Sequence, residues 1–248
     1  MNKLSTENLN LLPNPNELQK ICKSISALEA IISPEWEYRY YSYQRDWSET
    51  EDFCEMRNGQ GDQMLMVFSE NGTCINGFAL KSEMNGWRNI PINEERSFVE
   101  KLFGSKKETK TKLTQIVPKG ILDNLPAAFN EFIFGEPVQS IGTTFCIWQT
   151  DTDNEWQTGE VNLPKNDYKD GSSDLLQLLD GNPLTYKNWA EEYYEDEFES
   201  RELKLGLIER IYDGTVISKD LAIEINPNLE DFEKLKSDLN EIGYVHRI

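Results

Sequence analysis

The chain has 248 residues, enough to bury a substantial core in one large domain or two small ones. Apolar residues make up 38% of it and charged residues 28%, the mixture of a folded globular protein rather than of a disordered or membrane-spanning one. A formal net charge of −19 repels nucleic-acid phosphates and anionic lipid surfaces. The composition therefore predicts neither a nucleic-acid partner nor a membrane partner.

The negative charge is concentrated in the C-terminal part of the chain. Residues 1–150 carry 15 basic and 20 acidic side chains, whereas residues 151–248 carry 10 and 24. A field of this sign attracts basic proteins, although the same acidity also promotes solubility without any basic partner. The sequence leaves the oligomeric state open.

The cysteines and the N-terminus indicate a cytoplasmic protein with reduced thiols. The first residues are polar, so no secretory signal is predicted, and no stretch approaches the roughly 20 apolar residues of a membrane span. We expect no cofactor and no metal. The four cysteines lie far apart and form no Cys-x-x-Cys pair: Cys22, Cys54, Cys74 and Cys146.

A helix is predicted over residues 13–34. Asn14 can cap it, with Pro15 at the first helical position and Glu17 at the third. Apolar residues then repeat at helical spacing until Pro34 ends the run.

Residues 35–80 read as an antiparallel sheet. The aromatic-rich run at 36–43 favours a strand. Two apolar runs, 64–69 and 73–78, flank Glu70-Asn71-Gly72, and an Asn-Gly between such runs is a strong hairpin signal.

The middle of the chain predicts helices and one further strand pair. Residues 94–135 have helical spacing, interrupted by a lysine-rich polar link at 105–112 that we interpret as a solvated loop. A strand at 143–149 is expected to pair with 155–161.

From Gly171 onward the pattern is mainly helical. Helices are expected at 175–179, 185–194, around 203–211 and at 228–242, the last ending at Gly243. The predicted fold is therefore α+β: an antiparallel sheet covered by helices, with a mainly helical acidic C-terminal part. We expect one domain over 1–248, and the alternative is an α+β domain at 1–161 with a helical domain at 171–248.

The sequence contains no complete catalytic or metal-binding motif. The only histidine, His246, stands two residues from the C-terminus, which argues against histidine-based nucleophile systems and metal sites. The acidic run 151–155 lacks the glycine and the closing glutamate of a calcium loop, so it reads as a hairpin tip. We predict a protein that is not an enzyme, and a hydrolase with paired carboxylates in a cleft is the alternative.

The segment 189–199 combines six carboxylates with four aromatic side chains. One interpretation is a docking face, in which acids attract a basic partner and aromatic anchors hold it. The other is a surface helix whose aromatic stripe packs in the core. The candidates for partner binding are Glu191, Glu192, Tyr193, Tyr194, Glu195, Asp196, Glu197 and Glu199.

Several runs of the sequence resemble a family of acidic bacterial proteins of about this length. The runs are 33–41, 180–194, 226–227 and 241–244. That family has no defined catalytic residues to carry over, and it is similar in size and acidity to immunity proteins of the SUKH type. The resemblance implies a protein-binding function, with a basic bacterial toxin as the partner to be inhibited. A structural homodimer is a further alternative.

Overall fold

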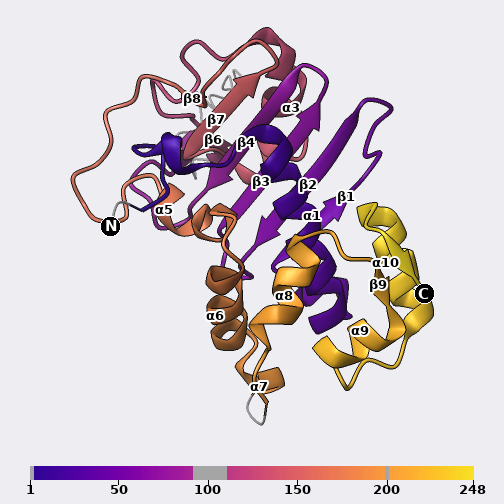
Figure 1. Ribbon diagram of the computed structural model, residues 1–248. Helices are drawn as coiled ribbons and strands as arrows, with labels where there is room; N and C mark the ends of the chain where they lie inside the picture. The colour runs from indigo at the N-terminus through magenta and orange to yellow at the C-terminus, as the bar shows by residue number, and fades with distance from the viewer. Residues whose placement is uncertain (1–2, 92–110, 199–200) are drawn as a thin grey trace, which may run out of the picture.

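The computed structural model describes residues 3–91, 111–198 and 201–248 and shows an α+β fold (Figure 1). Its centre is a six-stranded antiparallel sheet in the order β1-β2-β3-β4-β7-β8, and helices cover it, so the predicted fold class is confirmed. The strands are β1 (Tyr41–Gln44), β2 (Glu51–Arg57), β3 (Gln63–Ser69), β4 (Gly72–Phe78), β7 (Phe145–Thr150) and β8 (Gln157–Thr158).

Helix α1 (Pro15–Ile32) begins and ends where the sequence predicts. The Asn14 side chain accepts a hydrogen bond from the backbone N–H of Glu17 at 3.1 Å, and Pro15 occupies the first turn. The helix stops two residues before Pro34, whose ring cannot continue it.

The first strand starts later than predicted. Residues Trp36–Tyr38 form a 3₁₀ turn, and β1 begins only at Tyr41. The buried Arg39 holds this turn, because its guanidinium donates to the backbone oxygens of Ser33 (2.8 Å) and Pro34 (2.7 Å). The β propensity of the aromatic run is overridden here, since that propensity depends on packing against neighbouring strands.

The β3–β4 hairpin confirms the Asn-Gly prediction. Ser69 pairs with Gly72 across the turn, and Gly72 has a φ of +126°. A Cβ at Gly72 would lie 2.2 Å from the backbone oxygen of Gln149 on β7, so this position needs glycine both for its conformation and for the close approach of two strands.

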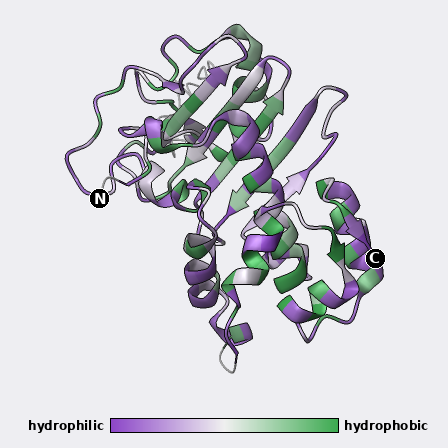
Figure 2. Cartoon of the chain, in the orientation of Figure 1, coloured by the Kyte–Doolittle hydropathy of each residue, from purple (hydrophilic) through white to green (hydrophobic). Residues whose placement is uncertain are grey.

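The sheet is buried on both faces because side chains alternate along each strand. On one face Met64, Met66 and Ile75 pack against α1 and the C-terminal helices in the larger core. On the other, Leu65 and Val67 pack against residues 121–138. Figure 2 shows hydrophobic colouring on the central strands, and both hydrophobic and hydrophilic bands on the C-terminal helices.

The middle segment differs from the helical prediction. Residues 92–110, with most of the lysine-rich link, lie outside the described residues, and 111–115 form a strand instead. Residues 121–124 form turns, and Leu125 avoids the helical region because it precedes Pro126. The elements here are β5 (Trp87–Pro91), paired with β6 (Thr111–Gln115), then η3 (Ala127–Phe129), α3 (Asn130–Phe134) and α4 (Val138–Ile141).

The C-terminal part is mainly helical, as predicted. Its last helix ends at Gly243 with a φ of +71°, but it starts at Phe232 rather than at 228, because Asp231 caps it by accepting from the N–H of Lys234. No described helix is both long and apolar enough to cross a membrane. The elements are α5 (Ser172–Leu175), η4 (Gln177–Leu179), α6 (Pro183–Tyr193), α7 (Glu195–Phe198), α8 (Leu205–Tyr212), β9 (Ile217–Ser218), α9 (Lys219–Ile225), α10 (Phe232–Ile242) and β10 (His246–Arg247).

Candidate functional site

The acidic–aromatic segment does not form one continuous helix. Helix α6 ends at Tyr193, Tyr194 leaves the helical conformation with φ −104° and ψ 43°, and α7 starts at Glu195. Glu191 and Glu195 therefore lie on two separate helices. Glu199 lies outside the described residues.

Tyr194 points inward to a buried carboxylate. Its hydroxyl donates to Glu29, a residue of α1 with no exposed surface. Glu29 also accepts from the hydroxyl of Tyr186 and from the backbone N–H of Tyr40, each at 2.8 Å. Burial raises the pKa of Glu29 above its ordinary value of 4.5, and the hydrogen bonds from Tyr194, Tyr186 and Tyr40 oppose that rise.

The rings around Glu29 form a packed aromatic cluster. The Trp189 ring stacks on that of Tyr193 with centroids 4.9 Å apart, and it lies 4.6 Å from that of Tyr40. Tyr194 meets Tyr193 edge to face at 4.9 Å. The buried carboxylate thus fixes Tyr194 and Tyr40, and these rings in turn position Tyr193 at the surface.

Three large aromatic side chains are exposed beside this cluster. Trp36 is 50% exposed, Tyr38 66% and Tyr193 39%, and we call these three residues the aromatic face. Tyr38 and Tyr193 line one hollow of about 530 Å³ together with Arg57. The Arg57 guanidinium lies 3.9 Å from the centre of the Trp36 ring and donates to the Trp36 backbone oxygen, which joins Trp36 to the same surface.

The carboxylates next to Tyr193 differ in whether they bond to other described residues. Glu191 accepts from Lys187 and from the N–H of Leu203, each at 2.8 Å, so it serves the local structure. The remaining described carboxylates of the segment are exposed and form no ion pair with another described residue. We call them the acidic turn: Glu192, Glu195, Asp196 and Glu197.

Trp36 and Tyr38 are functional candidates that the sequence reasoning missed, because it assigned them to a strand. Their signal was present in the order Glu35-Trp36-Glu37-Tyr38, where acids and aromatics stand close together as they do in 189–199. The preceding Pro34 separates this run from the helix, and the side chains of residues 35–38 lie exposed at the surface.

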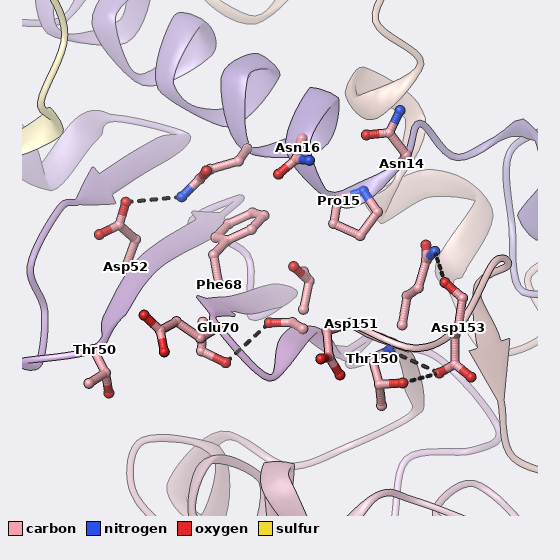
Figure 3. Close-up of a pocket in the computed structure, with 15 residues that line it drawn as sticks. Asn14, Pro15, Asn16, Thr50, Asp52, Phe68, Glu70, Thr150, Asp151 and Asp153 are labelled. Carbon is pink, nitrogen blue, oxygen red and sulfur yellow. Dashed lines mark hydrogen bonds between the residues drawn. The ribbon is translucent and has the colours of Figure 1, made fainter.

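A second concave region lies over the ends of the strands and is the subject of Figure 3. We call it the strand-end hollow. It has a volume of about 630 Å³ and is formed by the start of α1, the β3–β4 turn and the end of β7. The run 151–155 forms the turn after β7, as predicted, and Asp153 holds it by accepting from the N–H (2.9 Å) and the hydroxyl (2.7 Å) of Thr150.

Neither a cluster of metal ligands nor an exposed thiol is found in the described part of the chain. Within residues 3–91, 111–198 and 201–248, no three His, Cys, Asp or Glu side chains converge as metal ligands. All four cysteines are free and buried, and burial raises the pKa of the Cys54 and Cys74 thiols.

Comparison with protein-family models, curated proteins and solved structures finds no match for the chain.

Proposed function

We propose that the chain is a non-enzymatic protein-binding protein, which docks a basic protein on the aromatic face and the acidic turn. The observation that carries the proposal is the exposure of Trp36, Tyr38 and Tyr193 at 50%, 66% and 39% on one surface. Trp, Tyr and Arg are the side chains most enriched among the residues that dominate binding energy at interfaces. All three types occur here, because Arg57 joins Trp36 to the hollow.

The charge of the surface supports a basic partner. The acidic turn adds four exposed carboxylates beside Tyr193, and the whole chain carries a net charge of −19. Complementary charge raises the rate of encounter, whereas buried aromatic anchors slow dissociation. Two copies of a chain with this charge repel each other, which favours a basic partner over a homodimer.

The resemblance to SUKH-type immunity proteins makes a bacterial toxin the specific partner that we propose. An acidic, aromatic surface can cover the basic region through which a toxin reaches an anionic target. Glu29, which has no exposed surface, gives the hydrolase alternative little support, because three protein donors already bind its oxygens.

A differential pull-down from the native host tests the proposal. The wild-type chain, a Tyr38→Ala/Tyr193→Ala variant and a Phe134→Ala control are used as baits; Phe134 is an exposed aromatic, at 53%, outside the aromatic face. We expect a protein with an excess of Lys and Arg to be recovered by the wild type and the control but not by the double variant. Recovery of the same protein by the double variant, or of an acidic protein only, would contradict the proposal.

A further inference from the structure

The strand-end hollow has a floor of three adjacent strands. Phe68 of β3, Thr73 of β4 and Gln149 of β7 line it, and each is buried. They face the α1 side of the sheet, because the next residue after Thr73, Cys74, packs in the core of the opposite face. The start of α1 forms the facing wall through Pro15, as Figure 3 shows.

One polar group on this floor has no partner among the described residues. The Thr73 residue is only 2% exposed, and its hydroxyl forms no hydrogen bond with a described residue, but its oxygen is not among the fully buried polar atoms and opens to the hollow. A hydroxyl that opens to the hollow can bond to water there or to a polar group of a ligand.

The rim of the hollow is acidic. Its lining includes Asp52, Glu70, Asp151 and Asp153, and neither Lys nor Arg is among the described residues that line it. Asp52 is engaged by Lys23 at 3.2 Å, but Glu70 and Asp151 are exposed and form no ion pair within the described part of the chain. Figure 3 shows Glu70 and Asp151 on the side of the hollow across from Asn14 and Asn16.

Two of these acids are held in the ionised form. Burial acts to raise the pKa of Asp52, but hydrogen bonds, from Tyr43 first and also from the Asp46 N–H and Lys23, bring that pKa below its ordinary value. Hydrogen bonds from Thr150 lower the pKa of Asp153. The hollow is thus negative at neutral pH.

The start of α1 does not make the hollow a binding site for anions, although free N–H groups at a helix start can bind them. Pro15 has no N–H to offer, and the N–H of Glu17 is already bound by Asn14 at 3.1 Å. The carboxylate of Glu17 in the first turn also offsets the positive end of the helix dipole.

We propose that the strand-end hollow binds an ammonium or guanidinium group carried on an apolar stem. The stem packs between the Phe68 ring and Pro15, the cationic head lies among Glu70 and Asp151, and the Thr73 hydroxyl accepts one of its N–H groups. The inference does not depend on the aromatic face, with which this hollow shares no residue. A basic side chain of a protein and a free polyamine both have this chemistry.

Titration of the ¹⁵N-labelled chain with pentylamine, followed by amide chemical shifts, tests the inference. The neutral control ligand is 1-pentanol. The variants are Glu70→Gln/Asp151→Asn and Thr73→Val, and the charge-matched control is Glu195→Gln/Glu197→Gln on the acidic turn. A second arm compares spermidine with the blocked tripeptide acetyl-Gly-Lys-Gly-amide.

We expect saturable shifts at Gly72, Thr73 and Thr150, and much weaker binding of pentanol. The loss of two carboxylates should weaken pentylamine binding roughly tenfold, and Thr73→Val should weaken it a few fold, while the control variant binds as the wild type does. Tighter binding of spermidine assigns the site to free polyamines, and tighter binding of the tripeptide assigns it to a partner's basic side chain. Equal binding of pentanol, shifts located elsewhere, or an equal loss in the control variant would overturn the inference, and none of these results bears on the aromatic face.

Discussion

The aromatic face and the strand-end hollow both have acidic side chains beside them, but the surfaces next to these acids differ in shape. At the aromatic face, exposed carboxylates stand beside three exposed rings, one of which is held by a cluster around the buried Glu29. In the hollow, carboxylates surround a buried floor onto which the Thr73 side chain opens. The first arrangement suits a broad protein surface, and the second suits a single cationic group. Negative charge alone therefore identifies neither site.

The largest effect on stability is expected at the edge of the hollow. Gly72→Ala places a side chain at a φ of +126° and against the backbone oxygen of Gln149, 2.2 Å from the new Cβ. We expect a loss of about 3 kcal/mol in the free energy of unfolding, because strain and a backbone clash combine. Urea denaturation measures it, and a loss below about 0.5 kcal/mol would show that β4 and β7 are not so closely apposed.

Tyr194 should act on folding rather than directly on binding. Tyr194→Phe keeps the ring but removes a donor from the buried Glu29, which should cost about 1–3 kcal/mol of unfolding free energy. Tyr193→Phe is the matched control, since no described residue accepts a hydrogen bond from the Tyr193 hydroxyl. Equal thermal melts for the two variants would indicate that Tyr194 does not reach Glu29.

The raised pKa of Glu29 gives a pH dependence of known sign. The folded-state pKa lies above the ordinary value of 4.5. The contribution of Glu29 to folding stability is therefore fully present below about pH 4.5, and it is lost as the pH rises through the folded-state pKa. The stability of Glu29→Gln relative to the wild type should therefore increase between about pH 4 and pH 8. Unfolding free energies of both proteins across this range test it. A relative stability that falls with pH would mean that the three donors outweigh burial.

The smallest effect on stability is expected at the acidic turn. Replacing Glu192, Glu195 and Glu197 by Gln should change the free energy of unfolding by less than about 0.5 kcal/mol, because these side chains are exposed and form no ion pair among the described residues. The association rate with a basic partner should fall at low salt and lose part of its salt dependence. An unchanged association rate at low and high salt would remove the acidic turn from the docking surface.

The parts of the fold that could be predicted are those set by neighbouring residues. Asn14, Pro15 and Glu17 specify the start of α1 within one turn, and the local backbone conformations of Gly72 and Gly243 mark the start of β4 and the end of α10. The α+β class followed from these local signals, because an antiparallel hairpin and amphipathic helices leave few ways to cover a sheet.

The candidate sites depend on residues far apart in the chain and could be predicted only in part. Tyr194 was recognised as a candidate, but its bond to Glu29 joins residues 165 positions apart, which composition and spacing do not reveal. Trp36 and Tyr38 have strong strand propensity, but the hydrogen bonds of Arg39 to backbone oxygens hold them in an exposed turn instead. The strand-end hollow combines segments near residues 14–19, 50–52, 68–73 and 149–153, so no single run of sequence indicates it.

The most direct test of the central claim is the dissociation constant of the Tyr38→Ala/Tyr193→Ala variant with the basic protein that the wild type captures. Calorimetric titration at physiological salt, with Phe134→Ala as the control, gives the comparison, and thermal melts establish that each variant is folded. We expect the double variant to bind about 10- to 100-fold more weakly, the loss typical of truncated aromatic anchors, while Phe134→Ala binds as the wild type does. A folded double variant that binds with wild-type affinity would contradict the assignment of the aromatic face as the docking surface.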